Sequence, residues 1–596
     1  MGTFRIREQF KLLIWNAINP VQKTLHILGI IVSLTAMVAI VYFYGFPQTN
    51  LSRYICNLII YISLIFYVVK YLLMFIFNKH SFQFLANNKG EGIVVAFLLI
   101  WYLLTYILDI NFAGMLLGKI NVAGFNQMVI IGSQLFFFLL MFTDLIGVDQ
   151  LLVRFRLGPA GSLMGSFFIL ITLGTIILMM PEMTINGISL IDALFMATSA
   201  TCITGLSSID IPTVLTMKGQ LVLLILVQLG GLDIVCFATF FTSYYAGGAT
   251  KYRSMMKELV DTNNSKSLTK EIFLYTFVIE IIGFIAIFAY LWSTNNYSHH
   301  LADNVYLAAF HSVACFNNAG FCIVDGGMQN SLFVHDYYLQ TITILMTFLG
   351  GIGFLTIHDV VNTPKFGRHS KSFWNQITVS SKVVIKLSFI LWIVGALCFF
   401  IFERNNVNSS MNLLDQIFAS FFTSLSCRSH GFNIVDIGAL NISTLIIMII
   451  LMTIGTASVS TGGGIKLSTF YILLKSASAT IKNKHQVTIN NRAISYSLVN
   501  KSYLVLLFTV SLILIGCLVL SLSDPEMSFM QIFFEITSAC GTVGLSMGIT
   551  PSLSVIGKLT ITILMYIGRI TVLTLVLSVA KKAFTHYSVA KTSMNI

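Results

Sequence analysis

Charged residues are scarce in this chain of 596 residues, and their scarcity excludes an ordinary soluble fold. Asp, Glu, Lys and Arg together make up 10% of the sequence, whereas about a quarter is usual in soluble globular domains. Apolar residues make up 56%, and the mean hydropathy is +0.86. This composition is typical of a protein that crosses a membrane many times.

Sequence motifs of enzymes and metal proteins are also missing. The nine cysteines lie mostly within apolar stretches and lack the spacing of a zinc site or of a secreted disulfide scaffold. We interpret them as reduced packing residues. The chain has no Gly-rich nucleotide loop, paired-His metal motif or nucleophile elbow. A membrane-embedded enzyme that uses His311, His430 or the intramembrane Ser and Cys residues is therefore disfavoured, and no catalytic residue or catalytic cofactor is predicted.

Acidic residues are fewer than basic ones, 23 against 35, which gives a net charge of +12. The cations gather in alternate short loops between apolar runs, so the excess indicates membrane orientation rather than nucleic-acid binding. Loops assigned to the outer side hold only scattered cations, such as Arg53, Lys119, Lys218 and Arg404. With an even number of spans, both termini are predicted to be cytoplasmic in a multi-pass protein of the cytoplasmic membrane.

Long apolar runs predict twelve membrane spans, because about 20 apolar residues cross the hydrocarbon core. The first four lie within residues 1–150, near 25–45, 54–78, 92–109 and 127–147. The stretch before them is basic but is not followed by a small-residue cleavage site, so we expect a first helix rather than a removed signal peptide. The other eight lie near 161–181, 219–244, 268–293, 338–360, 381–402, 441–474, 499–521 and 554–580.

Four short segments share a glycine in a similar setting. They are Ile203-Thr204-Gly205, Asn318-Ala319-Gly320, Ser429-His430-Gly431 and Thr542-Val543-Gly544. Their glycines are 115, 111 and 113 residues apart, so a unit of nearly constant length carries each one. We therefore divide the chain into an extension, 1–150, and four repeats, 151–250, 251–370, 371–490 and 491–596.

Residues at fixed distances from these glycines strengthen the repeat. A phenylalanine precedes each glycine by ten residues, at Phe195, Phe310, Phe421 and Phe534. An aspartate follows three of them by five residues, at Asp210, Asp325 and Asp436, whereas the fourth repeat has Ile549. The aspartates either concentrate cations at an outer mouth or cap turns or pair with Arg428. We expect Arg428 to brace the third loop from behind.

The glycine loops suit the passage of a dehydrated cation. Backbone carbonyls can replace the water shell of an ion, and glycine allows the mirror-image backbone angles that turn neighbouring carbonyls inward. Short segments before the loops, at 191–201, 304–315, 413–425 and 528–539, are predicted half-helices whose carboxyl ends favour a cation. Asp192 and Asp415 suit the positive ends of two of them and are expected to cap them.

The ordered motifs resemble the Trk/Ktr/HKT superfamily of potassium transporters. They are Thr-Gly-Leu at 204–206, Phe-Asn-Asn-Ala-Gly-Phe at 316–321, Arg428 with Gly-Phe-Asn at 431–433, and Gly-Thr-Val-Gly-Leu-Ser at 541–546. The resemblance covers about 150–590. It implies an all-α membrane protein with four tandem helix, pore-helix, filter, helix repeats around one pore, preceded by about four extra transmembrane helices.

The resemblance also implies potassium uptake through a carbonyl-lined filter. All four filter glycines are present, and in the superfamily a serine at the first goes with sodium permeation. The small-residue run 455–464 matches an intramembrane gate, although close helix packing also explains such residues. The predicted gate residues are Gly455, Ser458, Ser460, Gly462, Gly463, Gly464 and Arg569. Relatives form dimers that bind cytoplasmic nucleotide-binding regulatory subunits. The expected partners are therefore a second copy of this chain, such regulatory subunits and membrane lipid.

Three other classes of membrane transport protein compete with this interpretation. A voltage-gated channel needs regularly spaced arginines, and 127–147 contains none. A secondary transporter built from inverted repeats conflicts with loops that all enter from one side. A symporter of the same fold, coupled to sodium or protons, remains the alternative to channel-like uptake.

Overall fold

The computed structural model describes two units of the chain. The described residues are 24–25, 28–29, 31–32, 34–77, 159–244, 265–294, 297–363, 373–484, 486–489 and 492–570. One unit covers Met1–Leu157 and the other Gly158–Ile596. The predicted spans near 92–109 and 127–147, and the final part of the span near 554–580, lie outside the described residues.

The first unit contains a long apolar helix, α2 (Asn50–Phe77), preceded by a shorter one at Leu34–Gly45. The side chain of Ser52, in the first turn of α2, donates to the Gln48 side chain at 3.0 Å. Ala36 and Tyr67 form a small buried cluster between the two helices. These helices correspond to the predicted spans near 25–45 and 54–78.

The second unit repeats one order of elements: a long helix, a short helix, a glycine loop, and a further helix or pair of helices. The first group is α8 (Pro159–Leu178), α9 (Leu190–Thr201) and α11 (Met217–Tyr244), and the second is α13 (Ser265–Thr294), α14 (Leu301–Phe316), α16 (Tyr337–Ile352) and α17 (Phe354–Asn362). The third is α19 (Val379–Glu403), α20 (Leu413–Ser429), α21 (Ile442–Thr453) and α22 (Leu467–Ile481), and the fourth is α23 (Tyr496–Ser523), α24 (Phe529–Gly541) and α25 (Val555–Ile570).

Short turns and one small hairpin connect these helices. The connecting helices are α10 (Ile211–Val214), α15 (Ser331–Val334), α18 (Phe373–Gln376) and the 3-10 turns Pro181–Met183, Gly327–Gln329, Val407–Ser410, Ile437–Ala439 and Thr550–Ser552. The strands β1 (Thr488–Ile489) and β2 (Arg492–Ala493) pair antiparallel, with Thr488 opposite Ala493. Within the described residues, this hairpin is the one departure from the predicted all-α fold.

The four predicted half-helices are helices, but the two predicted caps, Asp192 and Asp415, are wrong. Ser189 caps α9 by accepting from the backbone N–H of Asp192 at 3.1 Å. Asp192 therefore places its charge in the first turn, where the helix dipole favours it, without capping. Asp415 also lies in the first turn of α20, behind the N-cap residue Asn412, and accepts from the Tyr337 hydroxyl at 2.7 Å. A capping box formed by Ser528 and Gln531 starts α24.

The predicted continuous helix at 338–360 is wrong, because the chain bends by 94° between α16 and α17. Gly353 makes the bend with φ of +88°, a conformation that glycine adopts without steric cost. Within the described residues, four helices are long and apolar enough to cross a membrane, namely α2, α13, α19 and α23, and the bent pair can make a fifth. The predicted span near 441–474 is broken into α21 and α22.

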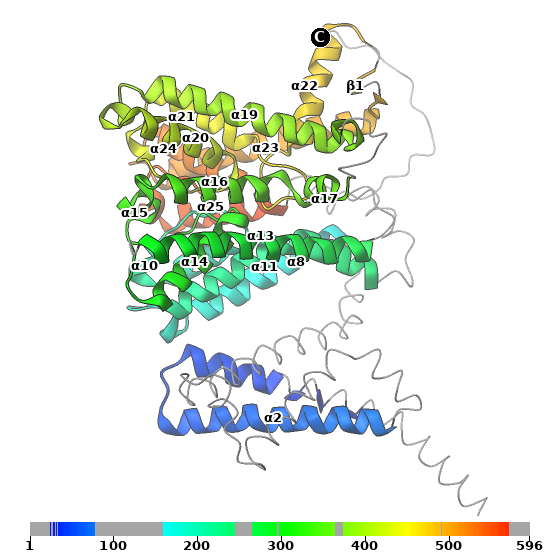
Figure 1. Cartoon of the computed structure of the whole chain (residues 1–596), viewed down its shortest axis with the longest axis vertical. Coiled ribbons are helices and arrows are strands. Elements are labelled where there is room, and N and C mark those ends of the chain that lie inside the picture. Colours follow the sequence, from blue (N-terminus) through cyan, green and yellow to red (C-terminus); the bar gives the residue numbers. More distant parts are fainter. Residues whose placement is uncertain are drawn as a thin grey trace, which may run out of the picture. The chain divides into compact units, whose positions relative to one another are not determined.

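The helices of the second unit pack in a closed cycle. Each short helix packs against the long helix before it and a helix after it, and Figure 1 shows α13, α16 and α19 running alongside one another. Helices of successive groups also touch, in the pairs α11 with α14, α16 with α20, α21 with α24, and α25 with α9. The last pair joins the fourth group back to the first.

Three of the repeated phenylalanines lie in the core of this unit. Phe195, Phe310 and Phe534 are at most 1% exposed. The third repeat departs from this pattern, because Phe421 is partly exposed and packs edge-on against Trp392 at 5.5 Å, while the next residue, Phe422, is fully buried. The four phenylalanines therefore share a position in the sequence repeat, but Phe421 does not share the burial of the other three.

Candidate functional site

The four glycine loops share an unusual backbone. Gly205, Gly320, Gly431 and Gly544 have φ angles of +89°, +69°, +66° and +95°. In three of the loops, the residue two positions before the glycine also has a left-handed backbone conformation. These residues are Ile203, Asn318 and Thr542. Side chains rarely adopt this conformation, so these loops are held in place by their surroundings.

Neighbouring loops meet through glycine and a carbonyl. A Cβ added to any of the four glycines would lie within 2.7 Å of the carbonyl oxygen that precedes the glycine of the next loop. These distances are 2.6 Å from Gly205 to Ala319, 2.7 Å from Gly320 to His430, 2.4 Å from Gly431 to Val543 and 2.1 Å from Gly544 to Thr204. The cycle closes, so four backbone carbonyls surround one axis and no side chain fits between the loops.

Each loop leaves its short helix through backbone hydrogen bonds. The N–H groups of Thr204, Ala319 and Val543 donate to carbonyls five residues earlier, at 2.8 to 2.9 Å. In the first and fourth loops the glycine N–H also donates to a serine hydroxyl, from Gly205 to Ser199 and from Gly544 to Ser538, both at 3.1 Å. These loop N–H groups are therefore satisfied by the short helices.

The third loop is built differently from the others. Helix α20 continues through Ser429, and the N–H of His430 bonds to Ser426, four residues earlier. The His430 ring is 1% exposed and packs between Phe422 and Phe432, each 5.7 Å away between ring centroids. The histidine thus turns its side chain into the protein while its carbonyl faces Gly320, and the imidazole stays out of the ring of carbonyls.

Glycines on the helices after the loops allow a close approach that sequence reasoning missed. A Cβ on Gly230, Gly350 or Gly568 would lie 2.0 to 2.2 Å from a carbonyl oxygen in the last turn of a short helix, at Thr201, Phe316 and Cys540. Each of these carbonyls belongs to the residue four before a loop glycine. The sequence signal that could have revealed these glycines is their distance from the loop glycine, which is 25, 30 and 24 residues in the first, second and fourth repeats.

The predicted gate residues at 455–464 lie between α21 and α22 and form a compact loop. Gly455 and Gly464 adjoin, because a Cβ on Gly464 would lie 2.9 Å from the Gly455 Cα. Ser460 donates to the Ala457 carbonyl at 2.7 Å, and Ser458 shares a hydrogen bond of 3.0 Å with Ser468. The loop therefore has a defined fold of its own.

This loop contacts three glycine loops at their helix ends. A Cβ on Gly462 would lie 2.0 Å from the Ser429 hydroxyl, and one on Gly463 would lie 2.2 Å from the Thr542 hydroxyl. The Asn318 amide and the Thr461 hydroxyl are 3.0 Å apart. Because Ser429, Thr542 and Asn318 all precede the loop glycines by two residues, the segment lies against the side of the ring where the short helices end.

Arg569 ties this loop to two helices. It is 1% exposed, and its guanidinium donates to the Thr461 carbonyl and, at 2.8 Å, to the Gly230 carbonyl on α11. Lys466, at the end of the same loop, donates to the Gly462 carbonyl at 2.6 Å. Two cations thus lie at the loop, on the far side of the ring from the residues that follow the loop glycines.

Arg428 braces the third repeat, as expected. It is buried and donates to the carbonyls of Ser388 on α19 and Gly455 in the loop between α21 and α22, at 3.2 and 3.4 Å. The aspartates after the loops are exposed. Asp210 accepts from the Thr213 hydroxyl at 2.6 Å and Asp436 from the Gly438 N–H at 2.9 Å. These two residues stabilise turns, which was one of the alternatives, whereas Asp325 lines a cavity.

A buried carboxylate behind the second loop was not predicted. Glu280 on α13 is 6% exposed and accepts from the side chains of Gln228 at 3.2 Å and Asn317 at 3.1 Å. Asn317 also donates to Gln228 at 2.8 Å and directly precedes Asn318. The network fixes the point where α14 becomes the loop. Its three members come from distant segments, so no sequence periodicity reveals it.

Comparison with known proteins gives consistent results. The family model TrkH, described as cation transport protein, matches residues 162–587. Ktr system potassium uptake protein B of Bacillus subtilis is 34% identical to this chain, and the alignment covers 73% of this chain and 95% of that protein. Potassium/sodium uptake protein NtpJ of Enterococcus hirae is 32% identical over 72% and 95%.

A solved structure shares the fold. The potassium transporter TrkH from Vibrio parahaemolyticus aligns with a TM-score of 0.58 at 16% identity and covers 82% of this chain and 97% of its own. The family match begins after the predicted extension and includes all four glycine loops. The chain is therefore a multi-pass membrane protein that belongs to the TrkH family of cation transport proteins, a family of transporters and not of enzymes.

Proposed function

We propose that this chain is the pore-forming subunit of a potassium uptake system in the cell membrane, with the four glycine loops as one selectivity filter. The observation that carries the proposal is the closed cycle in which each loop glycine faces the preceding carbonyl of the next loop. Rings of backbone carbonyls can replace the hydration shell of K⁺. The names of relatives that are potassium uptake proteins support K⁺ as the ion.

In this proposal the filter atoms are backbone oxygens of the four segments identified from sequence. The segments are 203–205, 318–320, 429–431 and 542–544. The short helices α9, α14, α20 and α24 direct their carboxyl ends toward the ring, where their dipoles favour a cation. The exposed carboxylates of Asp210, Asp325 and Asp436 then raise the local concentration of cations at the outer mouth.

The segment 455–464 with Arg569 is the proposed gate. It lies against the helix ends of three filter loops, and the Arg569 and Lys466 cations lie beside it. A cation there opposes the passage of K⁺ until the segment moves. The complete assembly is proposed as a homodimer in lipid, with cytoplasmic nucleotide-binding regulatory subunits that move the gate and with both termini of this chain in the cytoplasm.

The first test is growth and rubidium uptake in a bacterium that lacks potassium uptake. The wild-type chain, expressed with its cognate regulator, should restore both, and Gly431→Ala should abolish them because its Cβ would meet the Val543 carbonyl at 2.4 Å. Gly187→Ala is the matched control, since Gly187 also has positive φ but meets nothing within 4 Å. A properly inserted wild-type chain that restores neither growth nor uptake would leave the proposal without support.

Filter selectivity gives a second test at Gly205. We expect Gly205→Ser to raise sodium permeability relative to potassium, because its Cβ would lie 2.6 Å from the Ala319 carbonyl and displace a filter ligand. Gly548→Ser is the control, because Gly548 has φ of +86° and open space around it. Radiotracer flux of both ions into reconstituted vesicles measures the ratio, and an unchanged ratio in Gly205→Ser would contradict the filter assignment.

Coupled symport is the second candidate function. It is favoured by the relative named potassium/sodium uptake protein, which is 32% identical. Rubidium uptake into vesicles with and without imposed sodium or proton gradients separates the two modes. Uptake that follows the rubidium gradient alone supports a channel, whereas uphill rubidium movement driven by a second gradient supports symport.

A further inference from the structure

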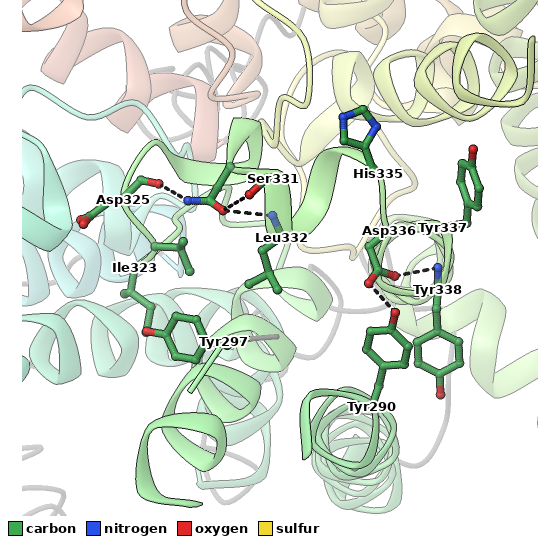
Figure 2. A pocket seen from close by; sticks show the side chains of 12 residues that line it. Tyr290, Tyr297, Ile323, Asp325, Ser331, Leu332, His335, Asp336, Tyr337 and Tyr338 are labelled. Carbon is green, nitrogen blue, oxygen red and sulfur yellow. Dashed lines mark hydrogen bonds between the residues drawn. The ribbon is translucent and has the colours of Figure 1, made fainter. Parts of the chain in front are cut away.

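A cavity of about 1000 Å³ lies in the second repeat, at the end where the segment after the second filter loop emerges. Its walls come from the end of α13, from residues 323–332 and from the start of α16. Figure 2 shows Tyr297 and Asp325 on one side and Tyr290, Tyr338 and Asp336 on the other, with Leu332 between them. This volume is far larger than a single metal ion requires and is suited to an organic molecule.

One wall of the cavity is a fixed aromatic surface. The rings of Tyr290 and Tyr338 stack with centroids 4.5 Å apart and an interplanar angle of 20°. The Tyr290 hydroxyl donates to Asp336 Oδ2 at 2.5 Å. The other oxygen, Oδ1, accepts from the backbone N–H groups of Tyr338 and Leu339, both at 3.0 Å. Asp336 therefore holds both tyrosines in place while it keeps a negative charge beside them.

The opposite wall repeats the combination of a phenol ring and a carboxylate. Tyr297 and Asp325 both line the cavity, and Asp325 is exposed. Burial, together with the carboxylates of Asp303 and Asp325, raises the pKa of Tyr297. The phenol thus stays neutral at physiological pH and presents an electron-rich ring. Among the described residues that line the cavity, none is lysine or arginine.

These features select one ligand chemistry. The carboxylates disfavour anions, because the described lining of the cavity includes one histidine, His335, but no lysine or arginine. The described residues also include no group of three His, Cys, Asp or Glu side chains able to hold a metal ion. Aromatic faces beside carboxylates attract organic ammonium groups by cation–π and Coulomb interactions. We propose that this cavity is a binding site for an organic ammonium group at the outer face, a placement that depends on the proposed function.

The site is connected to the filter, so its occupancy should affect ion flux. Ile323, in its wall, follows the filter residue Gly320 by three positions. Gln329, between the wall residues Asp325 and Asn330, donates to the carbonyl of Val435, which follows the third loop, at 3.0 Å. A ligand that joins the two walls would stiffen the outer ends of the second and third loops together.

Calorimetry of the purified full chain in nanodiscs of phosphatidylglycerol tests binding without reference to transport. Choline should bind, whereas its uncharged isostere 3,3-dimethylbutan-1-ol should not. We expect Tyr297→Leu and Asp325→Asn each to weaken choline binding by about tenfold, because each removes one ammonium contact. Tyr496→Leu, at a tyrosine that is 79% exposed on α23, should leave binding unchanged. Equal binding of choline and its isostere, or equal affinity in all variants, would overturn the proposal.

The ammonium group can come from a lipid headgroup or from a free solute, and two further arms separate the sources. If the source is a lipid, choline affinity should fall in nanodiscs of phosphatidylethanolamine, because that headgroup competes. If it is a solute, affinity should be the same in both lipids, and external choline should change rubidium flux in the wild type but not in Tyr297→Leu. Choline binding in a protein without rubidium flux would instead refute only the potassium uptake function.

Discussion

At the scale of single residues, three glycines let a helix lie against the last turn of the short helix that precedes a glycine loop. Gly230 shows the effect most clearly, because a Cβ there would lie 2.0 Å from the Thr201 carbonyl oxygen. We expect Gly230→Ala to destabilise the protein by about 1 to 3 kcal/mol, the usual cost of overpacking. The thermal unfolding midpoint in detergent measures it.

A matched glycine makes this prediction specific. Gly165 on α8 has nothing within 4 Å of an added Cβ, so Gly165→Ala should be neutral or should stabilise by up to about 1 kcal/mol through helix propensity. Equal midpoints for the two variants would mean that α11 does not approach α9 as closely as the structure indicates.

Glu280 positions the start of the second glycine loop, the second segment of the proposed filter. In Glu280→Gln the new amide N–H₂ replaces one acceptor oxygen, so the donors of Gln228 and Asn317 cannot both be satisfied. The loss of a charge-assisted hydrogen bond costs about 1.5 to 3 kcal/mol, and the displaced Asn317 should lower the potassium to sodium flux ratio.

The control for Glu280 is Glu526→Gln, at an exposed position, which should change neither the midpoint nor the flux ratio. A lowered midpoint in Glu280→Gln with an unchanged ratio would limit Glu280 to a structural role.

Sequence reasoning at this scale worked for residues that repeat. The four loop glycines were predicted as a set because they recur at nearly equal spacing, and the structure gives all four positive φ. Their role in a filter stays a prediction. The direction of the His430 ring and the Glu280 network depend on which helices meet. Gln228, Glu280 and Asn317 come from three helical segments, and the sequence alone does not place these segments together.

At the scale of elements, the four short helices were predicted to within a few residues because each lies at a similar place before a repeated loop glycine, as α24 does before Gly544. The capping box of Ser528 and Gln531 at the start of α24 was not predicted. The bend between α16 and α17 was missed because its partners are distant in sequence. The Phe354 N–H donates to Val459 and the Ala457 N–H to Gly351, so the loop between α21 and α22 stabilises the break.

Arg569 links that loop to α25 and α11, which makes it the element-scale test of the proposed gate. Arg569→Gln removes a guanidinium that donates to Thr461 and Gly230. The loss of hydrogen bonds from a charged group should reduce the stability of the closed position of the proposed gate segment by about 1.5 to 3 kcal/mol. Rubidium efflux from vesicles without regulatory subunits should therefore rise at least about tenfold.

Arg404→Gln, at an exposed position after α19, should leave this efflux unchanged. Reduced efflux in Arg569→Gln, with normal insertion, would assign the loop a supporting role instead of a gating role.

At the scale of the whole molecule, contacts between the ends of the second unit close the cycle of helices. Lys558 on α25 forms an ion pair of 2.7 Å with Asp192 on α9, and Tyr566 donates to the Met164 carbonyl on α8 at 2.8 Å. The repeat spacing predicted four similar units, but these contacts between the first and last units depend on side chains outside the repeated pattern.

The second unit should therefore transport ions without the extension. The family match starts at residue 162 and the second unit at Gly158. Removing the four spans predicted before residue 150 keeps the parity of the remaining spans, so the basic loops keep their predicted orientation.

A chain that starts at Gly158 behind an initiator methionine should insert into the membrane. Its rubidium uptake, divided by the amount of inserted protein, should equal that of the full chain. A chain that starts at Leu190 is the control, because losing α8 changes the parity and removes the packing partner of α9 and α11. Normal insertion of the longer chain without uptake would make the extension part of the transport machinery.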